Sequence, residues 1–432
     1  FKADFGPADF GAALGELGKT DPEARPLSLY VHLPFCSTLC LFCGCNTVIT
    51  KKEGVAGKYL DALEVEVATV AKALGSRRVV RQLHLGGGTP TYLTVEELER
   101  LHAILAKHFD LRDDEKAIEI DPRVTSVEQM KTLARLGFNR CSFGVQDFAD
   151  DVQRAVNRVQ SVEETRFLFD IARGLGFKGI NVDLIYGLPF QKLDTFEKSI
   201  EAVLDMRPDR IALYSYAHVP WMRPGQGGFE RHEMPLPSAE LKMQLFTRAI
   251  DRFGAAGYRH LGMDHFALPD DELALALDRG TLHRNFQGYT VRRAPDLLGL
   301  GQSSISDIGG SAEAAPGVYA QAEKDNAKYE AAAAGGRLST VRGLKLTAED
   351  ERRRKAILAI MCEGRLEGEL ARGFEQEIAS LAPLAERGLV NGVSKGRVEV
   401  TPLGRLFLRN IAMAFDVYLP KNAERPMFSR TV

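Results

Sequence analysis

Residues 29–46 read LYVHLPFCSTLCLFCGCN, an apolar run followed by four cysteines in a short loop. The apolar run predicts a β-strand. Cys36, Cys40 and Cys43 form a C-x3-C-x2-C triad, and Cys45 follows two residues later. Three thiolates this close together can bind three corners of an iron–sulfur cube. The fourth iron would then lack a protein ligand, and an open position of this kind is typical of catalytic metal sites.

A structural zinc site is the main alternative interpretation of these cysteines. Zinc sites usually draw their ligands as pairs from two separated segments, and Cys43 and Cys45 are too close in sequence to bind one tetrahedral ion comfortably. A closed electron-transfer cluster is also disfavoured, because no distant Cys-Pro completes a ferredoxin set. The spacing therefore favours a cluster with one open iron.

The composition is that of a globular protein, with 432 residues, 45% hydrophobic residues and a formal net charge of -2. This length predicts one large domain and at least one smaller domain. The charge gives no electrostatic reason to bind nucleic acid or an anionic membrane, and no apolar run is long enough to span a bilayer. Clustered cysteines without a recognisable signal peptide indicate metal chemistry in the reducing cytoplasm. The chain begins at Phe1 rather than Met, so we expect further sequence before it.

Predicted strands and helices alternate after the cysteine loop. The expected strands lie before the cysteines and at 81–85, 117–120, 139–144, 179–186 and 210–216. The expected helices lie at 59–74, 95–109, 126–136, 161–175, 195–206 and 238–256, with Ser126 as a helix N-cap. Such alternation predicts an α/β fold with a parallel sheet. Six units are too few to close an eight-stranded barrel, so we expect a partial (βα)6 barrel of the TIM type.

Polar residues and glycines follow the ends of these strands. In parallel barrels the C-terminal strand ends carry the active site, so we expect these residues on one rim with the cysteine loop. They are the cysteines, residues 86–90, Glu119, Asp121, Gln146, Asp183, Ala217 and His218.

The second half of the chain has weaker periodicity. Loops and short elements over the barrel mouth are expected at 257–273, 282–290 and 296–306, and an Ala-rich helix at 318–334. From 346 onward, a helical pattern, a strand–turn–strand at 389–400 and a helix at 402–415 predict a small winged-helix-like α/β domain. That domain is only modestly basic, so we expect a lid or packing role rather than DNA binding. The predicted division is an arm at 1–26, the barrel at 27–310, a helical connector at 311–345 and the C-terminal domain at 346–432.

The motifs together resemble the oxygen-independent coproporphyrinogen III oxidases, also called coproporphyrinogen dehydrogenases, of the radical S-adenosylmethionine (radical SAM) superfamily. The resemblance begins with YVHLPFCSTLCLFCGCN and covers essentially the whole chain in the same order. It continues through LHLGGGTPTYL, EIDPR, FGVQDF, VNR, DLIYGLP, YAHVP, GMDHFALPDDELA, HRNFQGYT, DLLGLG and FSR. The Arg-Tyr-Thr-Ser-Tyr-Pro-like arm of the family is not found before Phe1, and Leu268 and Val291 replace residues common in relatives.

The resemblance implies a 4Fe-4S cluster bound by Cys36, Cys40 and Cys43, with an accessory role for Cys45. It also implies two S-adenosylmethionine molecules, the first of which chelates the open iron. The implied contacts to the first molecule are Tyr30, Gly87 and Glu119. The implied contacts to the second are Phe42, Gly88, Thr89, Gln146, Arg158, Asp183, Ala217 and Ile305.

Each implied contact also has a structural explanation when it is taken alone. Residues 86–88 could form a simple turn, Glu119 or Asp183 could cap the next helix, and Arg158 could lie on the surface. Cys141 and Cys362 are expected in the core.

The implied activity is the anaerobic oxidative decarboxylation of two propionates of coproporphyrinogen III to vinyl groups, giving protoporphyrinogen IX in haem biosynthesis. In the family, a 5′-deoxyadenosyl radical made at the cluster takes a hydrogen from the propionate. No side chain is expected as a catalytic nucleophile. A monomer and a reduced flavodoxin- or ferredoxin-like donor are expected, and Arg284, Gln287 and Tyr289 are candidates for the tetrapyrrole site.

Two alternative functions are a haem-binding chaperone of the same superfamily and a non-catalytic, metal-stabilised scaffold. The chaperones typically lack the HRNFQGYT segment and the Gly44-Cys45-Asn46 continuation, both of which are present here.

Overall fold

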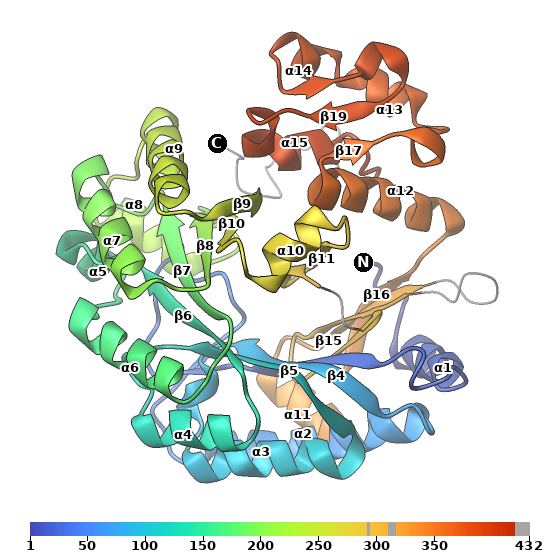
Figure 1. Cartoon of the computed structure of the whole chain (residues 1–432). Helices are drawn as coiled ribbons and strands as arrows, with labels where there is room; N and C mark the ends of the chain where they lie inside the picture. Colours follow the sequence, from blue (N-terminus) through green and yellow to red (C-terminus); the bar gives the residue numbers. More distant parts are fainter. Residues whose placement is uncertain (292–293, 310–316, 420–432) are drawn as a thin grey trace. The chain divides into compact units, whose positions relative to one another are not determined.

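Figure 1 shows the protein as a computed structural model that describes residues 1–291, 294–309 and 317–419. The chain packs as two compact units. The first unit comprises Phe1–Asp183 and Arg293–Leu346, and the second comprises Leu184–Arg292 and Thr347–Val432. The expected domain borders after residues 26, 310 and 345 stay predictions. The FSR motif at 428–430 lies outside the described residues.

A mixed sheet forms the centre of the first unit. Its strands include β1 (Leu27–Leu33), β4 (Val79–Gly87), β5 (Asp110–Ile120) and β6 (Arg140–Gln146). Each of these strands pairs in parallel with the next, and the register sets Tyr30 beside His84. Six of the seven residues of β1 are buried, as is typical of a parallel strand covered on both faces. The predicted strand order along the chain is confirmed here.

Four further strands extend this sheet beyond β1. They are β13 (Asp296–Leu300), β14 (Ile305–Ile308), β15 (Val318–Ala322) and β16 (Thr340–Lys345). β13 pairs in parallel with β1, and the other three follow in antiparallel order. Residues 296–306 were predicted to be loops and short elements over the barrel mouth. The short elements are present, but they are strands of the main sheet, because the apolar run DLLGL forms a buried strand.

The predicted helix over 318–334 is also wrong in its first part. Val318–Ala322 is strand β15, and helix α11 spans only Asn326–Ala334. Asp325 caps this helix by accepting a hydrogen bond from the Lys328 N–H, so the helix begins at the cap rather than at the start of the apolar pattern.

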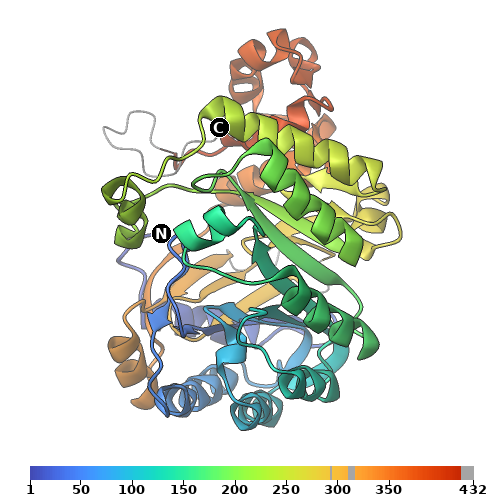
Figure 2. The ribbon, with the colours of Figure 1, turned by 90° about the vertical axis from the view of Figure 1, so that its left-hand side faces the viewer.

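The helices between the parallel strands lie where the sequence predicts them. They are α2 (Val55–Ala73), α3 (Val95–His108), α4 (Val127–Arg135) and α6 (Val162–Gly174). Two further helices, α1 (Pro7–Leu17) and α5 (Asp150–Ala155), were not predicted. Thr94, Ser126 and Ser161 form capping boxes at the starts of α3, α4 and α6, which confirms the predicted cap at Ser126. Figures 1 and 2 show α2, α3 and α4 side by side along the sheet.

A buried network joins α2 and α11 to the strand that leads into the cysteine loop. Glu66 of α2 accepts hydrogen bonds from the Tyr329 hydroxyl (2.7 Å) and the Gly301 N–H (2.8 Å). Burial raises the pKa of Glu66. The hydroxyl of Tyr59, also on α2, donates to the carbonyl of His32 in β1 (2.7 Å). These bonds fix β1 just before it reaches the cysteines.

The last two predicted strands are β7 (Ile180–Tyr186), which runs from the first unit into the second, and β8 (Arg210–Ser215). In the second unit, β10 (His265–Ala267) pairs antiparallel with β8 and with β9 (Arg259–Gly262). The remaining elements before residue 292 are α7 (Leu193–Met206), α8 (Gly228–Arg231), α9 (Ala239–Ala255), α10 (Glu272–Asp278), β11 (His283–Asn285) and β12 (Gly288–Thr290). The short elements predicted at 257–273 and 282–290 are confirmed.

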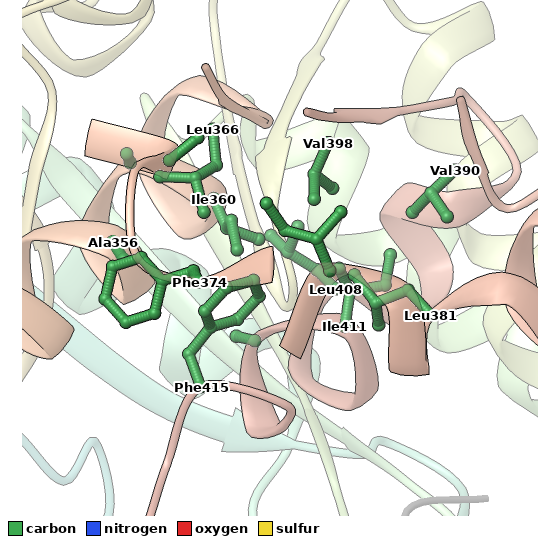
Figure 3. Packing of buried hydrophobic residues seen from close by; sticks show 14 residues of the cluster. Ala356, Ile360, Leu366, Phe374, Leu381, Val390, Val398, Leu408, Ile411 and Phe415 are labelled. Carbon is green, nitrogen blue, oxygen red and sulfur yellow. The ribbon is translucent and has the colours of Figure 1, made fainter. Parts of the chain in front are cut away.

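The C-terminal part of the second unit has its own apolar core (Figure 3), in which the rings of Phe374 and Phe415 meet edge to face at 5.4 Å. Its three short strands are β17 (Arg365–Leu366), β18 (Val390–Asn391) and β19 (Val398–Val400), and its helices are α12 (Ala348–Leu358), α13 (Glu375–Ser380), α14 (Ala382–Glu386) and α15 (Leu408–Met413). The single helix predicted at 402–415 is a 3-10 turn (Gly404–Phe407) followed by α15, because Phe407 departs from helical geometry (φ -114°, ψ 23°). Cys141 and Cys362 are buried as predicted.

Across residues 1–291, 294–309 and 317–419, none of the helices combines the length and apolar character that crossing a membrane requires.

Candidate active site

The cysteine loop lies between two short strands that pair with each other. β2 (Phe35–Cys36) runs parallel to β3 (Val48–Ile49) and closes the loop at its base. The Cys36 sulfur lies 3.4 Å from the Thr89 hydroxyl, the Cys43 N–H donates to the Cys40 carbonyl (3.0 Å), and the Cys45 N–H donates to the Cys43 sulfur (3.4 Å). Burial raises the pKa of the Cys36 thiol to about 11. A thiolate at this position therefore needs a positively charged partner such as iron.

Two guanidinium groups converge on Cys40, whose side chain is buried. The Cys40 sulfur accepts from Arg123 Nη2 at 3.5 Å and from Arg158 Nη1 at 3.7 Å. Asp121 holds both cations, because its carboxylate accepts from Arg123 (2.7 and 3.0 Å) and from Arg158 (3.1 Å). Burial alone would raise the pKa of Asp121, but the hydrogen bond and charges of the two arginines outweigh it and hold the pKa below its usual range. Arg158 is thus a buried member of the site and not a surface residue.

The glycine-rich turn at 86–88 is packed against protein atoms. A Cβ added at Gly87 would lie 2.6 Å from the His32 ring, and one at Gly88 would lie 2.6 Å from the backbone of Pro34. Gly87 also has a positive φ of 114°, which favours glycine. The N–H groups of Gly88 and Thr89 bond to the carbonyls of Leu33 and Phe35 (both 2.8 Å), so this turn supports the entry to the cysteine loop.

Gly88→Ala should therefore destabilise the protein even without any ligand. The added methyl group meets backbone atoms, which cannot rotate away, so we expect the free energy of unfolding to fall by about 1–3 kcal/mol. Gly44→Ala is the matched control, because a Cβ at Gly44 meets nothing within 4 Å. Urea denaturation of both variants without cofactors measures the effect. Equal stability of the two variants would show that the protein can accommodate a Cβ at Gly88 without a cost in the free energy of unfolding.

A second group of polar side chains surrounds Glu119 at the end of β5. Its carboxylate accepts from the Gly87 N–H (3.0 Å) and lies 3.3 Å from His84 Nε2. The His84 ring stacks on Tyr30 at 5.9 Å, and the Tyr30 hydroxyl lies 3.0 Å from His32 Nδ1. Burial alone would raise the pKa of Glu119, but the interactions with His84 and Gly87 lower it below the usual value. Glu119 does not cap α4, whose N-cap is Ser126.

The other predicted contacts in the first unit are distributed over several elements. Gln146 ends β6 in the left-handed region (φ 69°), a conformation that side chains rarely adopt. Asp183 on β7 accepts from the Ser142 hydroxyl (2.7 Å) and from Asn181 (2.8 Å), and does not cap α7. Ile305 begins β14, and Phe42 is half-buried in the cysteine loop.

The second unit contains the remaining candidates. Ala217 follows β8 and lines a cavity of about 220 Å³, together with Tyr214 and Asp264. Tyr289 is buried, and its hydroxyl donates to the Met361 carbonyl (2.8 Å). The Arg284 guanidinium lies over the Tyr289 ring at 5.7 Å. Arg284 Nε and Gln287 Nε2 are buried and have no hydrogen-bond partner among the described residues, so both are donors suited to a ligand.

Sequence reasoning did not assign Arg123, His32 or His84 to the site. The signal for Arg123 was present, because EIDPR places a charged pair directly after a predicted strand end. The two histidines are internal to strands, where only the register of β1 and β4 shows that they share a face with Tyr30 and Glu119.

Comparisons with known proteins place the chain in a family. Residues 30–203 match the Radical SAM superfamily. The oxygen-independent coproporphyrinogen III oxidase of Pseudomonas aeruginosa is 43% identical over 100% of this chain and 94% of its own length. That of Escherichia coli is 42% identical over 100% of this chain and 93% of its own length. This chain belongs to the oxygen-independent coproporphyrinogen III oxidase family. The predicted recognition is confirmed.

Structural comparison agrees with this membership of the oxygen-independent coproporphyrinogen III oxidase family. A solved structure of coproporphyrinogen III oxidase from Escherichia coli, described as a radical SAM enzyme, matches with a TM-score of 0.88 at 42% identity. The match covers 97% of this chain and 95% of that chain. The protein therefore has the α/β fold of the radical SAM superfamily, as predicted.

Radical SAM membership implies a 4Fe-4S cluster and S-adenosylmethionine, and the residues present fit both groups. Three thiols lie on one loop, and Arg123 and Arg158 donate to one of them. Within the described ranges, no three His, Cys, Asp or Glu side chains are gathered as a single metal ion would require. A cluster has a different requirement, since each thiolate binds its own iron. In the part of the chain that the structure describes, the buried Nε of Arg158 has no hydrogen-bond partner, so it is suited to an anionic ligand.

Proposed function

We propose that this protein decarboxylates two propionate side chains of coproporphyrinogen III to vinyl groups under anaerobic conditions, giving protoporphyrinogen IX in haem biosynthesis. The observation that carries this proposal is the full-length match, at 42–43% identity, to proteins named oxygen-independent coproporphyrinogen III oxidase. The reaction class is oxidoreduction dependent on S-adenosylmethionine.

The finer assignments of the cluster site belong to the same proposal. Cys36, Cys40 and Cys43 are its three protein ligands, and the exposed Cys45 is an accessory thiol. When bound, the cluster and S-adenosylmethionine supply reducing power and hydrogen-atom abstraction. The chain supplies orientation and exclusion of water, and no side chain is needed as a nucleophile.

The first S-adenosylmethionine is assigned to Tyr30, Gly87 and Glu119. Because its pKa is lowered, Glu119 is an ionised acceptor that can bind ribose hydroxyls. The stack of Tyr30 on His84 and the hydrogen bond from the Gly87 N–H hold the ring and the carboxylate in place before a ligand arrives.

A second S-adenosylmethionine is assigned to residues on several elements. Arg158 contributes its charge and its free Nε, since its other nitrogens are held by Asp121, Cys40 and Gly144. Asp183 is oriented by Ser142 and Asn181. The other proposed contacts are Phe42, Gly88, Thr89, Gln146, Ala217 and Ile305.

The tetrapyrrole is assigned to the second unit. Arg284 has a buried unpartnered Nε, and a guanidinium is suited to propionate carboxylates because it donates two parallel hydrogen bonds. Gln287 contributes a second buried donor. The Arg284 guanidinium lies over the Tyr289 ring, which helps to orient it. A reduced flavodoxin- or ferredoxin-like donor, a monomeric state and a cytoplasmic location stay predictions.

Anaerobic reconstitution with iron and sulfide tests the function. The loaded protein, given reductant, S-adenosylmethionine and coproporphyrinogen III, should form protoporphyrinogen IX together with 5′-deoxyadenosine. Omission of S-adenosylmethionine is the control and should stop both products. A loaded protein that binds haem but forms neither product would instead support the haem-chaperone alternative.

A further inference from the structure

Two arginine side chains, Arg123 and Arg158, donate hydrogen bonds to the Cys40 sulfur and are held there by other residues. Arg123 and Arg158 approach one sulfur, and Asp121 lies between them as a shared acceptor. The side chains of Asp121 and Arg158 are each 8% exposed, and that of Arg123 is 18% exposed. Two positive charges and one negative charge therefore leave a net positive charge beside a cysteine that is assigned to the cluster.

We propose that Arg123 raises the reduction potential of the cluster by donating a hydrogen bond to the Cys40 sulfur, with Asp121 as the residue that positions it. This inference rests on the proposed function, because it takes Cys40 to be a cluster ligand. The potentials of iron–sulfur clusters depend on hydrogen bonds to the sulfurs, on net charge and on exposure to solvent. Arg123 changes the first two of these at a site that is largely buried.

Arg123 and Arg158 have different hydrogen-bond partners, which indicates different roles. Arg123 gives Asp121 two side-chain hydrogen bonds and one from its backbone N–H (3.1 Å), so its guanidinium orientation is fixed from within its own turn. Its Nη2 is also the nearer of the two donors to the sulfur. Arg158 instead donates to Gly144 and keeps a buried Nε for a ligand. Arg123 is therefore committed to the cysteine and to Asp121.

The electron balance explains the direction of the effect. One electron passes from a low-potential flavin or iron–sulfur donor to the cluster, and no atom or proton moves with it. The cluster gains one negative charge, which a hydrogen-bonded cation in a low-dielectric site stabilises. Arg123 therefore favours the reduced state and makes the electron easier to supply.

An EPR-monitored redox titration of the reconstituted holoenzyme tests this role. Arg123→Met should shift the midpoint potential of the cluster to a more negative value. Arg123→Lys keeps the charge but not the planar fork, so it should shift the potential less. Asp121→Asn weakens the positioning of Arg123 but also removes a negative charge, which by itself makes the potential more positive, so the midpoint of this variant should lie above that of Arg123→Met. Arg112→Met changes an exposed arginine on β5 and is the matched control, with no expected shift.

Iron and sulfide content must be measured for every variant, so that assembly is separated from potential. A fully assembled Arg123→Met cluster with an unchanged midpoint would overturn the proposal, and if Arg123→Met fails to assemble, an unchanged midpoint of a fully assembled Arg123→Lys cluster would overturn it. Product formation by the unaltered protein is assayed separately. If that protein holds a cluster but forms no protoporphyrinogen IX, the proposed function fails, while the potential shift still decides the role of Arg123.

Discussion

Replacing any one of Cys36, Cys40 and Cys43 by alanine should abolish the cluster and reduce turnover to background. In the proposed assignment three thiolates hold three corners of the cube, so loss of one would expose a second iron to solvent and remove the fixed geometry of the open position. The loop contains no neighbouring His, Asp or Glu between residues 36 and 45 that could replace a lost thiolate. Anaerobic visible absorption, iron content and the protoporphyrinogen assay measure the three consequences independently.

Cys45→Ala is the control within the same loop. Cys45 is exposed, and its contact with the Cys43 sulfur uses its backbone N–H, which alanine keeps. We therefore expect this variant to retain a normal iron content, with at most a modest change in rate. Loss of the cluster in Cys45→Ala to the same extent as in the other three variants would contradict the assignment of three ligands.

The alternating part of the fold could be predicted because its signals are local. Apolar runs mark the strands, and the capping boxes at Thr94, Ser126 and Ser161 mark the starts of the helices within a few residues. The pairing of β13 with β1 had no such signal. It joins Leu27 to Asp296, and pairing over so long a separation depends on tertiary packing. The same distance explains why DLLGL was predicted to be part of a loop region.

The positions of the candidate residues could be predicted more completely than their surroundings. The spacing of the cysteines and the strand-end positions of Glu119 and Gln146 follow directly from the sequence. The convergence of Arg123 and Arg158 on Cys40 depends on how two loops fold towards each other, which spacing does not encode. Gly87 and Gly88 were predicted to contact S-adenosylmethionine. The structure adds a packing reason, since protein atoms occupy the space that a Cβ would need.

Arg77→Met should lower the free energy of unfolding by about 3–5 kcal/mol, the cost typical of breaking a buried ion pair. The side chains of Arg77 and Asp296 are both fully buried, and Arg77 Nη2 donates to the Asp296 carboxylate at 2.6 Å. Arg77 also donates to the carbonyl of Arg25 (2.7 Å) and to the hydroxyl of Thr20 (2.9 Å). Methionine fills similar space but removes the Arg77 hydrogen bonds to Asp296, the Arg25 carbonyl and the Thr20 hydroxyl. Asp296 would keep its bonds from Arg25 (2.8 Å) and from the Gly309 N–H (2.9 Å), so the N-terminal segment and β13 would lose part of their shared contact.

The matched control for this prediction is an exposed pair in the same unit. Arg112 and Glu23 lie 2.6 Å apart, but their side chains are 46% and 58% exposed, so Arg112→Met should cost only about 0.2–1 kcal/mol. Chemical denaturation of both variants, each compared with the unaltered protein, measures the difference. If Arg77→Met lowers the free energy of unfolding no more than Arg112→Met does, burial does not determine how much this ion pair stabilises the protein.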